Sequence, residues 1–260
     1  MLTKHPRNRQ FVWPSGQFGT RYLGADHVRQ YDEEGYFLLK RAFSPEQIRA
    51  VSKEIEPIEH AAEEASRTNG PTNRISKADA ITFTTYLVMR SALLRDFSRD
   101  AVFQGICSDL LGPHARLYHD QAVFKKPGNP EEFPWHQDNG YTFTEPQAGV
   151  TCWLPLTDAT VENGCPWVVP KVHREGTLAH VWTDLGYQCD VTGLPTVPVE
   201  AEVGDIVVFS RITPHRTGPN LTDAVRKAYV IQYSPNEVLA YRDSDVGVPQ
   251  DDPKRQYVVN

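Results

Sequence analysis

The chain has 260 residues, of which 40% are hydrophobic and 23% are charged, and its formal net charge is −6. A chain of this length can bury a sizeable core within one or two domains. The acidic balance and the lack of a Lys/Arg block argue against binding nucleic acid through a basic face. No apolar run reaches the length that spans a membrane, so a membrane is not an expected partner either.

The four cysteines are scattered along the chain and show no CxxC spacing, so they predict neither a disulfide framework nor a zinc ribbon. The first ten residues are polar and lack the apolar core of a secretory signal. Together these features predict a cytoplasmic, reducing environment. The cysteines are Cys107, Cys152, Cys165 and Cys189.

The beginning of the chain predicts an arm followed by a helix. Residues 1–25 carry Pro and Gly between aromatic residues, which is typical of an arm packed on the body of a domain. Ser44 and Gln47 form a capping box, with Pro45 at the first helical position, so a helix is expected to begin there. Pro57 is expected to end or kink this helix.

A second helix is predicted over residues 91–111, because apolar residues recur there at helical spacing and Gly112-Pro113 provides a stop signal. From about residue 115 the pattern changes to short β-type runs separated by Pro, Gly, Asn and Asp. Several such strands favour a sandwich, a barrel or a jelly roll. The expected strands are 117–125, 150–156, 168–170, 196–199, 205–210 and 227–233.

Two short segments carry the residues of a metal site. Trp135-His136-Gln137-Asp138 contains a His-x-Asp pair, and a second histidine, His215, lies far downstream. On an extended strand, residues at i and i+2 point to the same side, so His136 and Asp138 can reach one ion while Gln137 points away. Two imidazoles and one carboxylate are the facial triad that holds Fe(II) and leaves positions open for co-substrate and oxygen.

Each of these residues also has an interpretation that involves no metal. A His-x-Asp tripeptide often arises by chance, and a histidine after a proline is typical of a turn. The metal interpretation gains support from Arg226, which follows His215 by 11 residues. An arginine there could form a bidentate pair with the distal carboxylate of a 2-oxo acid, and the Thr217 hydroxyl could add a hydrogen bond. The alternative for Arg226 is an ordinary surface arginine beside Lys227.

An ordered set of motifs extends this pattern over about residues 26–235. As a set, they resemble the phytanoyl-CoA dioxygenase family of Fe(II)/2-oxoglutarate-dependent oxygenases, and they are far more specific than His-x-Asp alone. The motifs are Tyr-Asp-Glu-Glu-Gly-Tyr-Phe at 31–37, Phe-Ser-Pro-Glu-Gln-Ile at 43–48, Trp-His-Gln-Asp at 135–138, Cys-Trp-Leu-Pro-Leu at 152–156, Asp-Ala-Thr-Val-Glu-Asn-Gly-Cys at 158–165, Val-Pro-Lys-Val-His at 169–173, Gly-Asp-Ile-Val-Val-Phe at 204–209, His-Arg-Thr-Gly-Pro-Asn at 215–220, and Arg226.

The resemblance implies a mainly β fold with flanking α-helices, namely a double-stranded β-helix (a cupin-like jelly roll). It implies that His136, Asp138 and His215 bind Fe(II) as the catalytic centre, with 2-oxoglutarate and O2 as co-substrates. We expect a single oxygenase domain over residues 1–260. Its expected parts are the N-terminal arm and helices (1–114), the jelly-roll core (115–235) and a C-terminal tail (236–260).

The resemblance also implies a binding site for 2-oxoglutarate. Arg226 and Thr217 would hold a carboxylate of this co-substrate, and Trp153 would line its pocket, although a role as a core aromatic fits Trp153 equally well. Gln121 and Lys125 share one face of the strand before the metal motif. Each is a candidate for contact with 2-oxoglutarate or substrate, or else is a solvated strand residue.

Two positions bear on the kind of chemistry expected. The resemblance to this family implies that related halogenases lack the carboxylate, so that chloride can bind the iron. The presence of Asp138 therefore argues against halogenation. His173 follows Lys171-Val172 where the family usually has a small Gly-Ser turn, so we expect this loop to differ in shape from the family pattern. We expect His173 to be a structural turn residue and not a fourth ligand.

The expected substrate is a mid-sized small molecule of secondary metabolism, for example in antibiotic biosynthesis, and hydroxylation is the expected reaction. Epimerisation, desaturation and cyclisation are further outcomes of the same oxidant. Two rival hypotheses stay open: a cupin-like metalloenzyme that is not an oxygenase, and a catalytically silent jelly-roll binding protein. The residues expected at the mouth of the substrate pocket are Asn139, Tyr141, Phe143 and Trp182.

Overall fold

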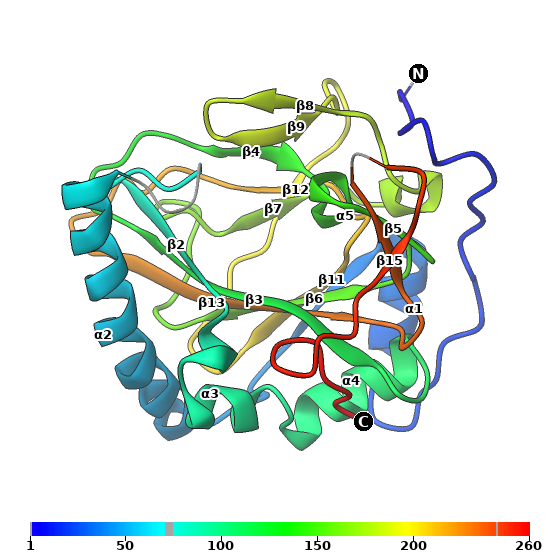
Figure 1. Cartoon of the computed structure of the whole chain (residues 1–260), viewed down its shortest axis with the longest axis horizontal. Helices are drawn as coiled ribbons and strands as arrows, with labels where there is room; N and C mark the ends of the chain where they lie inside the picture. The colour runs from blue at the N-terminus through cyan, green and yellow to red at the C-terminus, as the bar shows by residue number, and fades with distance from the viewer. Residues whose placement is uncertain (1, 71–74, 243) are drawn as a thin grey trace.

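Two antiparallel β-sheets face each other in the computed structural model, which describes residues 2–70, 75–242 and 244–260 (Figure 1). The larger sheet has the strand order β1-β11-β6-β13-β3-β2, and the smaller has the order β10-β7-β12-β4. The strands of the larger sheet are β1 (Tyr36–Leu39), β2 (Ile81–Thr85), β3 (Arg116–Lys125), β6 (Val150–Pro155), β11 (Ile206–Ser210) and β13 (Arg226–Ser234). Those of the smaller sheet are β4 (Phe133–His136), β7 (Pro166–Val168), β10 (Val197–Pro198) and β12 (His215–Thr217).

Alternate residues of the central strands face two different cores, as the two-residue period of a strand requires. On β13, Val230 packs in an apolar cluster shared by the two sheets, whereas Ile231 packs in the cluster shared with the helices. Trp153 and Leu154 of β6 divide in the same way. The predicted fold, a mainly β jelly roll with flanking helices, is confirmed.

Helices cover the outer face of the larger sheet, opposite the face that meets the smaller sheet (Figure 1). These helices are α1 (Ala25–Glu34), α2 (Pro45–Asn69), α3 (Ala92–Phe97) and α4 (Ala101–Leu110). The short helix α5 (Asp138–Tyr141) follows β4, and two 3-10 turns occupy Leu87–Met89 and Val172–Glu175.

The predicted start of α2 is confirmed, and of the two outcomes expected at Pro57, an end or a kink, the end is wrong. The Ser44 hydroxyl accepts a hydrogen bond from the Gln47 amide, and the Gln47 side chain accepts one from the Ser44 amide at 2.9 Å. Pro57 does not end the helix, which runs on to Asn69. The reason is a set of buried contacts made by the second half of the helix.

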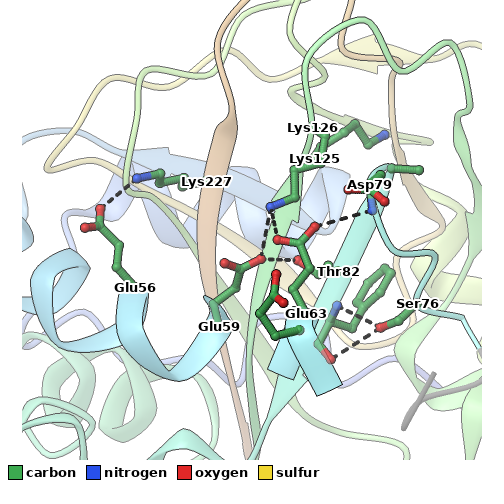
Figure 2. Close-up of polar contacts among 12 residues, drawn as sticks. Glu56, Glu59, Glu63, Ser76, Asp79, Thr82, Lys125, Lys126 and Lys227 are labelled. Atoms are coloured by element: carbon green, nitrogen blue, oxygen red, sulfur yellow. Dashed lines mark hydrogen bonds and ion pairs between the residues drawn. The ribbon is translucent and has the colours of Figure 1, made fainter. Parts of the chain in front are cut away.

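Two buried carboxylates attach that second half to the larger sheet (Figure 2). Glu59 accepts a hydrogen bond from Thr82 Oγ1 of β2 at 2.6 Å, and Glu63 pairs with Lys126 Nζ at 2.6 Å. Hydrogen bonds to ionised groups are stronger than neutral ones. These tertiary contacts therefore outweigh the backbone hydrogen bond that Pro57 removes.

The helix predicted over residues 91–111 is in fact two helices, α3 and α4. The Ser91 hydroxyl accepts from the Leu94 amide at the start of α3, and the Asp100 carboxylate accepts from the Val102 amide at the start of α4. Asp favours an N-cap over a helix interior because its side chain competes for backbone amides. Asp100 therefore starts a second helix.

Each predicted strand is present, with shifted ends. Residues 117–125, 150–156, 205–210 and 227–233 correspond to β3, β6, β11 and β13. β10 is shorter than predicted, and β7 lies mostly before the predicted range 168–170, because the chain turns after Val168.

Several strands were not anticipated from the sequence. β1 and β2 of the larger sheet come from the first 114 residues, so the sheets are not confined to residues 115–235. The last 25 residues contribute β14 (Leu239–Tyr241) and β15 (Val248–Pro249), which join β5 (Phe143–Glu145) in a small sheet. A hairpin of β8 (His180–Thr183) and β9 (Gly186–Cys189) lies over β4 (Figure 1).

Within the described residues, no helix has both the length and the apolar character needed to cross a membrane. The four cysteines are free and buried.

Candidate metal centre

The pairing of β4 with β12 brings two distant histidines together. His136 is the last residue of β4 and His215 is the first residue of β12, and the two are directly opposite in the antiparallel register. Their ring centroids are 4.2 Å apart. Both side chains are buried, with 6% and 7% of their surface exposed.

Asp138 reaches the same point from the first position of α5 and not from a strand. The expectation that His136 and Asp138 are i and i+2 neighbours on one extended strand is therefore wrong. The chain turns after Gln137, whose buried amide is held by three backbone groups and points away from the site, as predicted. Asp138 Oδ1 lies 3.9 Å from His136 Nε2 and 3.7 Å from His215 Nε2.

Backbone carbonyls decide which ring nitrogen of each histidine is free. His136 Nδ1 lies 2.8 Å from the Pro134 carbonyl, and His215 Nδ1 lies 3.0 Å from the Thr213 carbonyl. A carbonyl only accepts, so each Nδ1 donates, and in the neutral imidazole the free lone pair is then on Nε2. Burial, helped by the neighbouring His215, holds the pKa of His136 well below its usual range, so this imidazole is neutral at pH 7.

Thr151 of β6 orients the carboxylate. Its hydroxyl donates to Asp138 Oδ2, which leaves Oδ1 facing the two histidines. The ligand atoms of His136, Asp138 and His215 all lie within 4.8 Å of one another. Two imidazoles and one carboxylate that face a common point fit a divalent metal with open positions, and the donor set suits non-haem Fe(II).

Arg226, the first residue of β13, is buried and incompletely paired. Its Nη1 donates to the Val123 carbonyl at 3.3 Å, whereas Nε and Nη2 have no partner among the described residues. These two atoms form the side-on fork with which a guanidinium grips a carboxylate. Burial lowers the pKa of Arg226 to about 10, which leaves the side chain charged at pH 7. The unpaired fork fits the distal carboxylate of 2-oxoglutarate.

Three other predicted residues surround Arg226. Lys125 is its partner in the β3–β13 register, and Lys125 Nζ lies 3.3 Å from Thr217 Oγ1. The guanidinium carbon of Arg226 lies 5.5 Å from the ring centroid of Trp153. Burial and then the Arg226 charge lower the pKa of Lys125 to about 6, so a bound anion here would restore its positive charge. The four residues form one basic cluster, which we call the Arg226 pocket after the carboxylate-binding pocket expected here.

A cavity of about 500 Å³ opens beside the metal ligands and takes in both His136 and Asp138. Of the five residues predicted to contact 2-oxoglutarate or substrate, Gln121 of β3 lines this cavity. Tyr141 and Trp182, which were expected at the mouth of the substrate pocket, also line it. The cavity is therefore the natural space for a substrate.

The other two residues expected at the mouth face elsewhere. Asn139 is buried and donates to Thr177 Oγ1 at 2.7 Å, and Phe143 stacks on His5 with ring centroids 4.7 Å apart. His173 is a buried structural residue, as expected, because its Nε2 lies 3.1 Å from the Asp32 carbonyl, away from the metal ligands.

Several polar residues of the cavity wall were not anticipated from the sequence. His119 of β3 and Gln232 of β13 are register partners, Arg211 follows β11, and Arg242 and Arg255 come from the C-terminal segment. Arg211 could have been recognised in the sequence, because an arginine inside an apolar run is unusual. The two C-terminal arginines could not have been recognised in this way, since their place in the cavity wall depends on long-range contacts.

The fold and the ligand set define a jelly-roll protein with a buried facial triad. The family model of phytanoyl-CoA dioxygenase matches residues 31–228. The chain belongs to the phytanoyl-CoA dioxygenase family.

Two curated relatives illustrate how far this similarity extends. Phytanoyl-CoA dioxygenase of Arabidopsis thaliana is 29% identical over 144 residues, which cover 53% of this chain and 50% of that protein. The match thus spans about half of that relative's length. A probable phytanoyl-CoA dioxygenase of Caenorhabditis elegans is 27% identical over 247 residues, covering 84% and 78% of the two chains.

Solved structures share the fold at low sequence identity. The non-haem α-ketoglutarate-dependent carbocyclase SnoK from nogalamycin biosynthesis matches with a TM-score of 0.75 and 24% identity over 92% of this chain and 97% of its own. EctD from S. alaskensis, solved with 2-oxoglutarate and 5-hydroxyectoine, matches with a TM-score of 0.70 and 17% identity over 91% and 83% of the two chains.

Proposed function

We propose that this protein is an Fe(II)/2-oxoglutarate-dependent oxygenase. The observation that carries the proposal is the presence, in one jelly roll, of a convergent His-Asp-His set and an arginine whose carboxylate-binding fork is unpaired. A cupin-like metalloenzyme that uses no 2-oxo acid would need only the ligand set. A catalytically silent binding protein would need neither feature. Membership of the family supports the same conclusion.

In this proposal His136, Asp138 and His215 hold Fe(II) through two Nε2 atoms and one carboxylate oxygen. Iron and 2-oxoglutarate, when bound, supply the oxidising chemistry with O2. The protein keeps the three ligands oriented through Thr151 and two backbone carbonyls. Such outer contacts fix the tautomers of ligating histidines and raise metal affinity.

The Arg226 pocket is the proposed seat of 2-oxoglutarate. Arg226 grips the distal carboxylate through Nε and Nη2, and Thr217 and Lys125 border it. Trp153 forms the wall beside the guanidinium. Gln121 lies four residues from Lys125 on the same face of β3, so it contacts either the co-substrate or the substrate.

The proposed reaction is hydroxylation of a mid-sized small molecule in secondary metabolism, such as antibiotic biosynthesis, within one oxygenase domain formed by residues 1–260. A cavity of about 500 Å³ suits a ligand of that size. SnoK acts in nogalamycin biosynthesis and EctD was solved with a hydroxylated product, so both cyclisation and hydroxylation occur on this fold. The Asp138 carboxylate fills the position that a halide would need, so halogenation is not proposed.

The test is anaerobic titration of 2-oxoglutarate into the Fe(II)-loaded protein. We expect a weak visible charge-transfer band, which disappears in His136→Ala. In Arg226→Gln the band should need about 10- to 100-fold more 2-oxoglutarate, because a charge-assisted bidentate contact is lost.

His60→Ala, at an exposed position of α2, is the matched control and should leave the titration unchanged. A band that survives in His136→Ala would contradict the proposed ligand set. Release of succinate that depends on neither iron nor 2-oxoglutarate would contradict the proposed chemistry.

A further inference from the structure

Arg211 is a buried cation whose charge no described residue of the protein neutralises. It is 1% exposed, and its Nε and Nη1 atoms have no hydrogen-bond partner among the described residues. The ion pairs within these residues also leave Arg211 without a carboxylate. A guanidinium remains charged in proteins, and a buried charge without a partner is costly. The cavity beside the metal ligands is the space that Arg211 lines.

Two contacts, with Tyr118 and Gly149, fix the position of the Arg211 side chain. Its guanidinium carbon lies 3.7 Å from the ring centroid of Tyr118, a cation–π contact that holds the group beside β3 at the wall of the cavity. Its methylene stem lies against Gly149, where an added Cβ would be 2.3 Å from Arg211 Cδ. The glycine therefore leaves room for the stem, and the tyrosine fixes the charged end.

The cavity wall is positively charged, although the whole chain has a formal net charge of −6. Arg211, Arg242 and Arg255 all line it, and Asp138, a proposed metal ligand, is the one carboxylate among its described lining residues. Arg255 is partly neutralised by Asp252 at 3.1 Å. Arg211 is thus the buried cation of the wall that lacks a protein partner.

Arg211 lies near the metal ligands and away from the Arg226 pocket. Thr151, which bonds Asp138, is the register partner of Gln232, and Gln232 is the partner of His119, so the three form a row across the larger sheet. Arg211 stacks on Tyr118, next to that row. Arg226 is opposite Lys125, six residues along β3 from His119, which is roughly 20 Å of strand.

We infer that Arg211 binds an oxyanion, a carboxylate or a phosphonate, on the substrate of this enzyme. The inference rests on the proposed function and adds to it the class of substrate. The Arg226 pocket takes the co-substrate. A second buried and unpaired guanidinium, in the wall of the cavity that His136 and Asp138 also line, therefore has the substrate as its partner. The anion anchors one end of the molecule in the cavity, and the carbon to be oxidised lies between this anchor and the metal.

The test compares three probes of similar shape: phenylacetate, benzylphosphonate and neutral phenylacetamide. Each is titrated calorimetrically into the anaerobic Fe(II) protein saturated with 2-oxoglutarate. We expect one of the two oxyanions to bind at least about tenfold tighter than the amide, since hydrogen bonds to a charged group are worth this much. Which oxyanion binds tighter identifies the group that the natural substrate carries.

Arg211→Gln should weaken oxyanion binding by about 10- to 100-fold and leave amide binding unchanged. The control Arg242→Gln, in an exposed arginine of the same wall, should keep the preference for the oxyanion. Equal binding of amide and oxyanions to the wild-type protein would overturn the inference without requiring any variant. Retention of the preference in Arg211→Gln would overturn it as well.

The two proposals fail in different ways. If the charge-transfer band with 2-oxoglutarate never forms but the oxyanion preference is present and depends on Arg211, only the proposed oxygenase function is wrong. If the band forms normally and the oxyanion preference is absent, only the substrate inference is wrong.

Discussion

The two carboxylate oxygens of Asp138 have different roles, and one hydrogen bond from a hydroxyl group determines which oxygen has which role. Thr151 donates to Oδ2, so Oδ1 is the atom left to face His136 and His215. The same principle applies to the histidines, whose Nδ1 atoms are occupied by backbone carbonyls. At the scale of single residues, hydrogen bonds occupy Oδ2 of Asp138 and the Nδ1 atoms of both histidines. The remaining ligand atoms are therefore the ones available to a metal.

Thr151→Val is therefore expected to weaken metal binding while preserving the fold. The valine keeps the shape but removes the donor, so the carboxylate can rotate away from the histidines. Loss of an outer-shell contact of this kind costs about 10- to 100-fold in metal affinity. Titration with Fe(II) or Co(II) under anaerobic conditions measures the change.

Thr68→Val, on the exposed end of α2, is the matched control and should bind metal as the wild-type protein does. Equal metal affinity in Thr151→Val and wild type would show that the carboxylate is held by other means.

How far the sequence predicts single residues depends on how their contacts arise. The three ligand positions carry motif signals, and the structure brings them together. Thr151 carries no signal, because it meets Asp138 only when β6 lies beside α5. Arg211 carries a weak one, since its burial reflects the packing of Tyr118 and Gly149.

At the scale of elements, α2 shows which local signals determine structure and which do not. The capping box at Ser44 acts within a few residues, and the helix begins where it predicts. Pro57 is an equally local signal for an end, but buried contacts from Glu59 and Glu63 override it. Sequence patterns therefore predict helix starts better than helix ends when an element is attached to a sheet by distant residues.

Ser44→Ala is expected to lower the free energy of unfolding by about 1 kcal/mol, because one orphan amide at the start of α2 loses its acceptor. Urea denaturation at neutral pH measures the loss. Ser52→Ala, in the interior of the same helix, should be neutral or slightly stabilising, since Ala has the higher helix propensity. If both variants lose equal stability, the cap is not the cause.

At the scale of the whole molecule, buried histidines make the fold sensitive to acid. Burial lowers the pKa of His119, His173 and His180 to about 4. Between pH 6.5 and 4 the unfolded chain therefore binds more protons at these positions, so stability falls as pH falls. Burial raises the pKa of Asp120 to about 6 and also raises the pKa of Glu145, and these two carboxyl groups act in the opposite direction.

In the metal-free protein His136, whose pKa also lies well below its usual range, adds a fourth buried imidazole. The net difference of two to three protons predicts that the free energy of unfolding drops by about 3 to 4 kcal/mol per pH unit near pH 5. Urea denaturation at a series of pH values measures the slope. His173→Gln, which removes one buried imidazole, should make the slope shallower. A stability profile that is flat from pH 7 to pH 5 would contradict the account.

The whole-molecule arrangement also sets what the sequence could not predict. Strand periodicity and the family motifs predict the jelly roll, because they are repeated along much of the chain. The cavity wall instead combines β2, β3 and β13 with residues near the C-terminus, such as Arg255. Local sequence patterns do not predict contacts between such distant segments. The positive charge of the cavity wall can therefore be recognised only in the folded molecule.

Arg211 and the metal ligands belong to one stretch of backbone. The segment 211–215 leads from the guanidinium to His215, and the Asn139 amide, next to Asp138, donates to the Arg211 carbonyl at 3.1 Å. The separation between anchor and metal is thus built into the main chain. A substrate held by its anion would present whichever carbon lies at that separation, so lengthening its chain would move the site of attack along the molecule. Regioselectivity would be counted from the anionic end.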